Sequence, residues 1–361
     1  MQQPLNNLPA AYSLPVLGEL CKFCKIEDLY ASLADSAGTI AADKDLCQYA
    51  CSLYDDFINK TNCFAHCPRP FDKLSENADH IFFLTVLSAI PTALKRYRSQ
   101  ETPEDIIAAT LNFSGIANSN GDTSNTIKFH PCQVGYCRSY YKAEIYQLGR
   151  FHFKLHKDKR DLPAVVINRK NPSQKVLLAA DQTFCDDRGF VDNEKPTWLT
   201  RASLSEKSIS GNIINADGTA GKECAEFSSD EWSWQYGART VIDMHIPAGG
   251  GMKPEISRES LKKAFRFFSS KAQVIYCNSW ILNPDLQGLA GTDNMTALMK
   301  MGHLFPVKSS DKEGMFFLFG CESDDLDSLP KTTTLQRSAV EFMKKGGKLR
   351  AGGIFFFDDE I

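Results

Sequence analysis

The sequence lacks the features that mark several large classes of protein. Its 361 residues include 41 Lys and Arg against 44 Asp and Glu, so the net charge is −3 at pH 7 and there is no basic excess. General nucleic-acid binding needs a basic face, and we therefore expect no nucleic-acid partner. No internal repeat and no low-complexity segment is present, which excludes a repeat protein. What remains, with 43% hydrophobic and 24% charged residues, is the composition of an ordinary globular protein.

Long apolar runs and a secretory leader are also missing. The longest apolar stretch, residues 81–94, is interrupted by Thr85, Ser88 and Pro91 and is too short to span a bilayer. The first seven residues lack the basic segment and apolar run of a signal peptide. We therefore predict a cytoplasmic protein with no membrane partner, in which residues 81–94 belong to a buried helix.

Cysteine, in contrast, is abundant. Half of the twelve lie in the first 67 residues: Cys21, Cys24, Cys47, Cys51, Cys63 and Cys67. The i, i+4 spacings place pairs of thiols on single helix faces, where a cross-linked helical hairpin or a four-thiolate zinc site is chemically feasible. A second CxxC at zinc-ribbon spacing is absent, and His130, Cys132 and Cys137 have no fourth ligand nearby. We favour unpaired core cysteines and predict no metal site.

The residue pattern changes near residue 144, where we place a domain boundary. Before it, the pattern predicts a helical N-terminal domain, residues 1–143, with helices over Asn77–Tyr97 and from Thr102 onward. After it, residues 144–361 predict a mixed α/β domain of the α+β type, beginning with a half-buried strand over Tyr146–Leu155. The fold class is therefore a helical domain followed by a mixed-sheet domain.

Within the second domain the pattern predicts the following elements. Residues 164–167 and 175–178 form a hairpin. Residues 180–221 form a polar segment with one short strand at 212–214, either a long surface loop that shapes the substrate entrance or an insertion without a functional role. A short helix follows at 228–234, and another starts at Asn283 and reaches about Met301. Residues 304–307 and 315–319 form antiparallel strands, 334–345 a helix and 353–357 a last strand.

One stretch, residues 240–282, organises this domain. A strand over Thr240–Pro247 leads through a glycine turn into an amphipathic helix over Pro254–Ser269, and a second strand follows at Val274–Leu282. This order predicts a parallel strand pair joined by a helix, with ligands near the C-terminal ends of the strands.

Ionisable and glycine residues gather at the end of the first strand. Asp243 and His245 share one strand face, opposite Ile242 and Met244. A histidine near neutral pKa next to a carboxylate is a candidate general base, although a histidine that only fixes the strand end is equally compatible with the pattern. The turn at 248–251 opens a helix, which is where backbone N–H groups bind phosphates.

The motifs VIDMHIPAGG at 241–250, CNSWILNPDL at 277–286 and the closing TTLQRSAVEFMKKGGKLRAGG at 333–353 resemble bacterial acyltransferase-domain proteins. These proteins join an N-terminal helical domain to a GNAT-like C-terminal domain. The resemblance implies an acyl-CoA-dependent N-acyltransferase that uses acetyl-CoA or another acyl-CoA. It also implies that the acyl group passes directly to a small-molecule or peptide amine.

By this resemblance, the strands before and after the glycine turn splay apart and the pantetheine lies in the gap. Ala248, Gly249, Gly250 and Gly251 would then hold the CoA diphosphate. The resemblance further implies that Ile246, Asn278 and Trp280 flank the cofactor. His245 would be the base, supported by Asp243. The helix after the second strand lacks the tyrosine that often protonates the leaving thiolate, so Ser279 or Tyr276 is the candidate donor.

Two other functions stay open at this stage. Cys277 could be the nucleophile of a hydrolase with His245 as its base. Alternatively, the missing tyrosine is compatible with a protein that binds acyl-CoA or a partner without catalysis.

Overall fold

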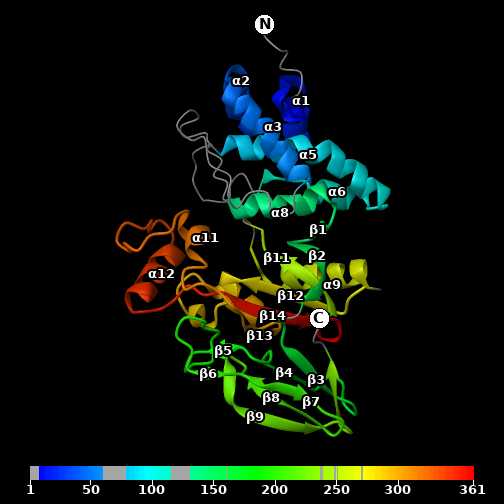
Figure 1. Ribbon diagram of the computed structural model, residues 1–361, viewed down its shortest axis with the longest axis vertical. Coiled ribbons are helices and arrows are strands. Elements are labelled where there is room, and N and C mark those ends of the chain that lie inside the picture. The colour runs from blue at the N-terminus through cyan, green and yellow to red at the C-terminus, as the bar shows by residue number, and fades with distance from the viewer. Residues whose placement is uncertain are drawn as a thin grey trace. The chain divides into compact units, whose positions relative to one another are not determined.

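The computed structural model describes residues 8–59, 79–114, 131–159, 161–235, 239–247, 249, 251–269 and 271–361, without the side chains of 131–135, 158 and 239. By contacts the chain divides into two units. The first comprises Met1–Leu148 with Pro247–Gly249, and the second Gly149–Ile246 with Gly250–Ile361. Figure 1 labels the elements of both units. Among the described residues, no helix is both long and apolar enough to cross a membrane.

The first unit is helical, as predicted. Its centre is α5 (His80–Ser99), which is buried along its first eleven residues and contacts α2 (Tyr30–Ala42), α3 (Lys44–Asn59) and α8 (Pro131–Tyr141). The predicted helix over Asn77–Tyr97 is confirmed from His80 onward, while Asn77 and Ala78 lie outside the described residues. The Tyr97 hydroxyl donates to the carbonyl of Ile145 at 2.7 Å, which fixes the start of the short strand β1 to α5.

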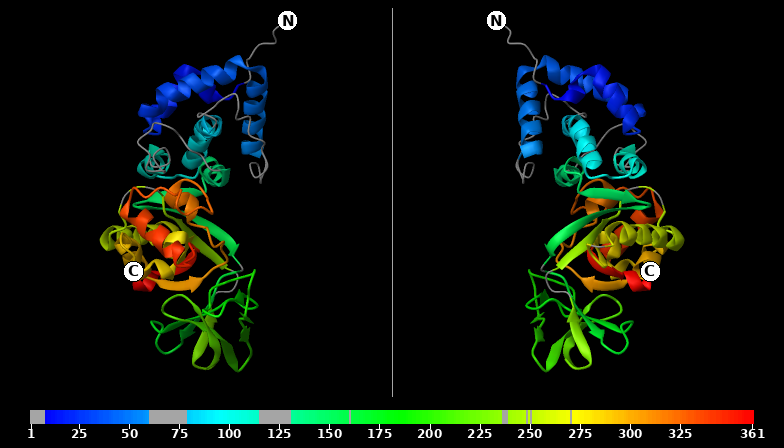
Figure 2. Two further views of the ribbon diagram at one scale, coloured as in Figure 1. Left: turned by 90° about the vertical axis from the view of Figure 1, so that its left-hand side faces the viewer. Right: turned by 90° about the vertical axis from the view of Figure 1, so that its right-hand side faces the viewer.

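The other elements of the first unit surround α5. They are η1 (Ala10–Tyr12), α1 (Leu14–Phe23), η2 (Glu27–Leu29), α2 (Tyr30–Ala42), α3 (Lys44–Asn59), α6 (Glu104–Thr110), α8 (Pro131–Tyr141) and β1 (Ile145–Leu148). In both views of Figure 2 these helices form one group.

Three of the described cysteines of the first unit, Cys21, Cys24 and Cys137, lie in this helical core. Cys21 and Cys24 are buried, and burial raises the pKa of the Cys21 thiol to about 11. Cys47 and Cys51 lie one turn apart on α3, as the spacing predicts. Cys63, Cys67 and His130 lie outside the described residues, as does the side chain of Cys132. Within the described ranges, no group of three or more potential metal ligands is present.

The second unit is built on a mixed sheet. Within this unit its strand order is β2 (Phe151–Lys159), β11 (Arg239–His245), β12 (Val274–Ser279), β14 (Gly352–Phe357) and β13 (His303–Pro306). β11 and β12 are parallel and are joined by α9 (Pro254–Phe268), as predicted. The last strand, β14, is buried at all six residues and lies between β12 and β13 (Figure 1).

The chain between β2 and β11 forms a second sheet. Its order is β10 (Trp232–Gln235), β3 (Ala164–Asn168), β4 (Lys175–Leu178), β8 (Ser208–Ile214) and β7 (Ala202–Leu204), with β9 (Ala220–Ser228) paired to β8. The predicted β3–β4 hairpin is confirmed. Apolar residues of the two sheets share one core, in which Val165 and Leu177 meet Tyr276 and Phe355.

The remaining elements lie after β12. They are η4 (Trp280–Leu282), η5 (Pro284–Leu286), α10 (Asp293–Met299), α11 (Met315–Phe319), α12 (Thr334–Lys344) and η6 (Asp358–Glu360). The predicted helix over 334–345 is confirmed. Thr333 caps it, because its hydroxyl accepts from the Gln336 N–H at 3.1 Å.

The predicted single strand over Tyr146–Leu155 is wrong. The chain turns at Gly149, which has φ of +79°, so β1 and β2 are separate strands. A side chain at this glycine would be strained in that conformation and would meet Ser260 of α9 at 3.3 Å. Phe151 and Phe153 are fully buried as predicted, but the burial does not alternate along β2, because His152 is buried as well and Leu155 is only half-buried.

The polar segment 180–221 is not a long loop. It contains β7, β8 and the small hairpin of β5 (Phe184–Cys185) with β6 (Trp198–Leu199). The predicted helix at 228–234 is also wrong, because Trp232 and Trp234 belong to β10 and pair with β3. These strands depend on their partners in the sheet rather than on their own apolar pattern.

Three predictions for the C-terminal part of the chain differ from the structure. The helix expected from Asn283 to Met301 is broken by Gly288 and Gly291, which have φ of +83° and +88°. The predicted strand at 315–319 is helix α11, which ends at Gly320. The strand expected over Val274–Leu282 ends at Ser279, since Trp280 begins a 3-10 turn.

Candidate active site

The parallel strands β11 and β12 define the candidate site. Among the described residues their paired positions are Ile242 with Ile275 and Asp243 with Tyr276. β11 continues to His245 and β12 to Ser279 beyond these pairs. The two C-terminal strand halves therefore lie outside the paired region, at the edge where ligands of parallel sheets bind.

Asp243 and His245 come together at this edge. His245 Nε2 lies 3.3 Å from Asp243 Oδ2, and Lys154 Nζ of β2 lies 3.6 Å from the same oxygen. Burial alone raises the pKa of Asp243, but His245, Lys154 and His156 outweigh it, so the pKa lies below its usual value. Asp243 is therefore an ionised carboxylate near neutral pH.

β2 supplies the rest of this polar face. In the antiparallel ladder His152 pairs with His245, and Lys154 pairs with Asp243. Burial, together with His245 and Arg150, lowers the pKa of His152 to about 3, so this ring is neutral. The sequence pattern places His152 and Lys154 on the polar face of a strand, but their contact with β11 depends on strand register.

The glycine turn is described in part. Gly249, which belongs to the first unit, has φ of +75°, and among the described residues nothing lies within 4 Å of a Cβ built there. Gly251, which belongs to the second unit, also has no described atom within 4 Å of a built Cβ, and its carbonyl accepts from Arg150 Nε at 3.3 Å. Ala248 and Gly250 lie outside the described residues.

The helix after this turn begins at Pro254. Lys253 is at its N-cap position, and no side chain caps the helix there. Open space at Gly251 next to a helix N-terminus is compatible with binding of an anion.

Strand alternation separates the candidate residues of β12. Tyr276 is paired with Asp243, so Tyr276 and Asn278 lie on the face of Asp243, whereas Cys277 and Ser279 lie on the other. Trp280 is half-buried in η4. The Cys277 thiol is fully buried, and burial raises its pKa well above the usual value. A Cys277 nucleophile activated by His245 is therefore contradicted by the structure.

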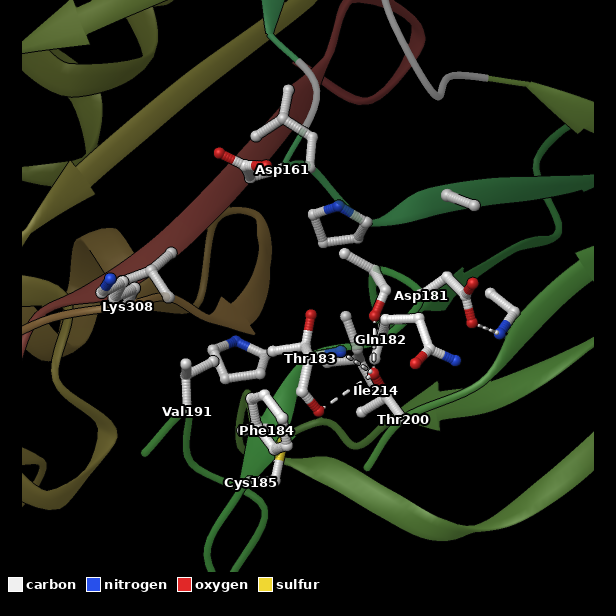
Figure 3. A pocket seen from close by; sticks show the side chains of 18 of the residues that line it. Asp161, Asp181, Gln182, Thr183, Phe184, Cys185, Val191, Thr200, Ile214 and Lys308 are labelled. Carbon is white, nitrogen blue, oxygen red and sulfur yellow. Dashed lines mark hydrogen bonds between the residues drawn. The ribbon is translucent and has the colours of Figure 1, made fainter. Parts of the chain in front are cut away.

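A cavity of about 660 Å³ lies within the second unit, next to β12 (Figure 3). Tyr276 and Asn278 line it from the first sheet, and Asp181, Gln182 and Phe184 line it from the polar segment 180–221. Asp243 and His245 are not among its lining residues. Sequence reasoning missed this cavity because it treated residues 180–221 as a surface loop.

Comparison with known proteins gives a consistent family. The family described as GNAT-like C-terminal domain matches residues 145–355, which is more than half of the chain. No curated protein matches the sequence.

Among solved structures, the chain is similar to an acyltransferase in complex with decanoyl-CoA and teicoplanin. That match has 16% identity, a TM-score of 0.58, and coverage of 99% of this chain and 91% of that chain. A second is an acyltransferase mutant in complex with octanoyl-CoA, at 16% identity and a TM-score of 0.56, covering 94% of each chain. At this identity the likeness shows the fold alone, and it confirms the predicted helical region followed by a GNAT-like domain. The chain belongs to the family of proteins with a GNAT-like C-terminal domain.

Proposed function

We propose that the protein is an acyl-CoA-dependent acyltransferase that transfers the acyl group to an amine. One observation carries the proposal: among the described residues, the parallel strands β11 and β12 pair at two positions only, so their C-terminal ends are not paired with each other. Solved structures of the same fold are acyltransferases in complex with octanoyl-CoA or decanoyl-CoA, which supports acyl-CoA as the co-substrate.

In this proposal the cofactor lies along the edge formed by the two strands. The turn residues Ala248, Gly249, Gly250 and Gly251 are the proposed ligands of the diphosphate, which they would bind through their backbone N–H groups. Ile246 on one side, and Asn278 and Trp280 on the other, flank the pantetheine and the thioester. The open space at Gly251 supports this placement, since a diphosphate needs close approach to the backbone.

The reaction needs a base, and His245 is the proposed one. The amine nitrogen attacks the thioester carbon and loses a proton to the imidazole, and the C–S bond then breaks. Asp243, 3.3 Å from Nε2, holds the ring in place and stabilises the imidazolium. Lys154 keeps the carboxylate ionised, because its ammonium group is 3.6 Å away.

The donor to the CoA thiolate is Tyr276 or Ser279 in this scheme. Tyr276 lies on the face of Asp243, but burial raises its pKa, so its hydroxyl stays protonated and can donate. Ser279 is at the end of β12, on the opposite face and more exposed.

The alternative function is a protein that binds acyl-CoA without catalysis. It is favoured by the burial of Tyr276, which is 4% exposed and so less able to reach a thiolate than a residue at the strand end. The two functions differ in turnover and not in binding.

The test measures acyl transfer. Octanoyl-CoA is incubated with the protein and a mixture of primary amines, and both free CoA and acylated amine are quantified by mass spectrometry. His245→Gln should lower kcat about 100-fold, as expected for a general base, while octanoyl-CoA binds as before. His303→Gln, a histidine that contacts Glu360 of the C-terminal turn, is the matched control. Tight binding of octanoyl-CoA without any acylated amine would favour the alternative function.

A further inference from the structure

The cavity next to β12 has a mixed polar lining. Asp161 and Asp181 contribute carboxylates, and Lys159 and Lys308 contribute ammonium groups. Within the part of the chain that the structure describes, none of these four side chains forms an ion pair, although Asp181 accepts a hydrogen bond from the Ala202 N–H and Lys159 Nζ lies 5.3 Å from the centre of the Tyr276 ring. Figure 3 shows Lys308 on one side of the cavity and Asp181 on the other. The cavity thus presents charges of both signs.

Aromatic and amide side chains complete the lining. Phe184 is 48% exposed although it is a large apolar residue, so one face of its ring is available to a ligand. Trp234 and Asn193 also line the cavity. Gln182 has φ of +57°, an uncommon conformation for a residue other than glycine. Such conformations persist where the surrounding structure holds them, often at ligand sites.

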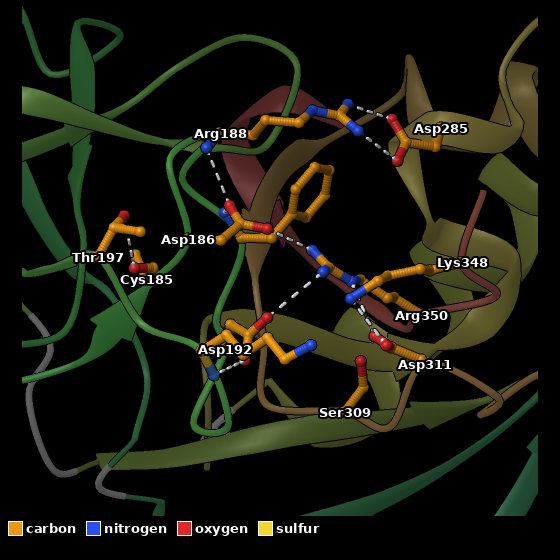
Figure 4. Close-up of polar contacts among 12 residues, drawn as sticks. Cys185, Asp186, Arg188, Asp192, Thr197, Asp285, Ser309, Asp311, Lys348 and Arg350 are labelled. Atoms are coloured by element: carbon orange, nitrogen blue, oxygen red, sulfur yellow. Dashed lines mark hydrogen bonds and ion pairs between the residues drawn. The ribbon is translucent and has the colours of Figure 1, made fainter. Parts of the chain in front are cut away.

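The wall that carries Phe184 is fixed to the first sheet. Arg350, which precedes β14 and has a side chain only 8% exposed, contacts three carboxylates of the second unit (Figure 4). The distances are 2.8 Å to Asp186, 3.6 Å to Asp192 and 3.3 Å to Asp311. Asp186 and Asp192 belong to the β5–β6 hairpin. The cavity is therefore a built feature rather than a gap beside a loose loop.

A second arginine strengthens this attachment. Arg188 of the same hairpin makes a two-pronged contact with Asp285, just after β12, with one N–O distance of 3.0 Å. Arg188 and Arg350 both stack on Phe190, at 4.9 and 5.0 Å from its ring centre.

We propose that this cavity is the acceptor chamber and that it takes a zwitterionic amine, a small molecule with an ammonium group, a carboxylate and an apolar body. The inference rests on the proposed acyl transfer. Lys308 and Lys159 bind the carboxylate, Asp161 and Asp181 attract the ammonium group, and Phe184 contacts the apolar body. A long acyl chain does not suit this cavity, because burying charged side chains against hydrocarbon is costly.

Two residues of β12 belong both to the cavity lining and to the strand face of Asp243. Tyr276 and Asn278 line the cavity and lie on the face of Asp243, which Tyr276 pairs with directly. An amine that leaves the chamber at Asn278 would meet the thioester held between the two strands. There the ammonium group first loses one proton to solvent, and the lone pair of the free amine nitrogen forms a bond to the acyl carbon. The nitrogen then gives a second proton to His245, the C–S bond breaks, and CoA leaves as the thiol after protonation of its sulfur.

The test uses three probes that share one ring and differ in charge: L-phenylalanine, phenethylamine and 3-phenylpropionate. Their binding to the full-length protein is measured by calorimetry and by tryptophan fluorescence, since Trp234 lines the cavity. L-Phenylalanine should bind in a saturable manner and about fivefold more tightly than either single-charge probe, the size expected for one exposed ion pair.

Two variants test which charged side chain binds the carboxylate of the ligand and which binds its ammonium group. Lys308→Gln should weaken L-phenylalanine about fivefold and leave phenethylamine unchanged, while Asp181→Asn should weaken L-phenylalanine and leave 3-phenylpropionate unchanged. Asparagine keeps an oxygen for the hydrogen bond that Asp181 accepts from the Ala202 N–H. Glu206→Gln, an exposed turn residue outside the cavity, is the control.

The outcomes separate this inference from the proposed function. Equal affinity for the three probes, or no effect of either variant, overturns the zwitterion chamber. So does competition between L-phenylalanine and octanoyl-CoA that strengthens with acyl-chain length, because the chain would then occupy the cavity. If octanoyl-CoA binds and L-phenylalanine does not, only this inference fails. If L-phenylalanine binds and no acyl-CoA does, the proposed function fails.

Discussion

Replacing Arg350 with methionine should destabilise the second unit strongly. The side chain is 8% exposed and offsets the charges of Asp186, Asp192 and Asp311, whose side chains are 20%, 13% and 49% exposed. Methionine preserves much of the apolar stem but leaves these carboxylates without their shared cation. Removing one partner from a buried ion pair costs about 3–5 kcal/mol.

We expect the lower end of that range for Arg350→Met. Asp311 keeps an ion pair with Lys348 at 2.7 Å, and Asp192 keeps hydrogen bonds from the N–H groups of Glu194 and Lys195. Both contacts reduce the cost of the missing guanidinium, so the free energy of unfolding should fall by about 3 kcal/mol.

Tryptophan fluorescence during urea unfolding measures this loss in the second unit alone. All four tryptophans, Trp198, Trp232, Trp234 and Trp280, belong to that unit. Arg266→Met, on the exposed side of α9, is the matched control and should change stability by less than about 0.5 kcal/mol. A loss below about 1 kcal/mol for Arg350→Met would mean that the network contributes no more than surface ion pairs, and would refute the reasoning.

Two further predictions concern stability. Burial keeps the folded-state pKa of His152 at about 3, below the value of about 6.5 for an exposed histidine. The neutral, buried ring therefore stabilises the fold fully above about pH 6.5, and this stabilisation is lost as the pH falls toward the folded-state pKa. Between pH 7.5 and pH 5 the free energy of unfolding should drop by about 2 kcal/mol because of this ring. In urea titrations, the stability of His152→Phe should depend less on pH than that of the wild type. An unchanged pH dependence would contradict the role assigned to His152. Gly352→Ala should destabilise by more than about 2 kcal/mol, because its Cβ would lie 2.0 Å from the carbonyl oxygen of Leu282. Gly251→Ala, where nothing lies within 4 Å, should be near neutral in the same urea assay, and equal losses for both variants would contradict the steric argument.

The sequence was sufficient for elements whose own pattern is strong. Helix α9 has buried residues at helical spacing, and β11 alternates apolar with polar side chains, so both are predicted correctly. Helix α12 has a capping box at Thr333 that marks its first residue. In each case the residues of the element itself are sufficient to predict its secondary structure.

Elements that depend on distant partners could not be predicted in this way. β8 and β9 consist largely of small and polar residues, and they are strands because they pair with each other. The helix expected after Asn283 is interrupted because the glycines that follow adopt positive φ. Glycine can adopt either sign of φ, so the sequence alone does not determine this conformation.

The residues of the candidate site likewise include some that a local pattern predicts and others that depend on distant parts of the chain. Asp243 and His245 are found from strand alternation alone, because both lie on one element. Lys154 and His152 need the register between β2 and β11, which no local pattern fixes. The cavity beside Asn278 depends on the second sheet and the β5–β6 hairpin, of which the sequence predicted only the β3–β4 hairpin and a short strand at 212–214.

The most direct test of the central claim is a calorimetric titration of the protein with octanoyl-CoA. The account predicts a dissociation constant in the micromolar range, about −8 kcal/mol. Gly251→Phe, which fills the open space of the turn, should weaken binding about tenfold or more, equal to about 1.4 kcal/mol. Gly38→Phe, at another open glycine on α2, should bind as the wild type does. Absence of heat, together with no rise in Tm at high octanoyl-CoA concentration, would contradict the claim that the β11–β12 edge holds acyl-CoA.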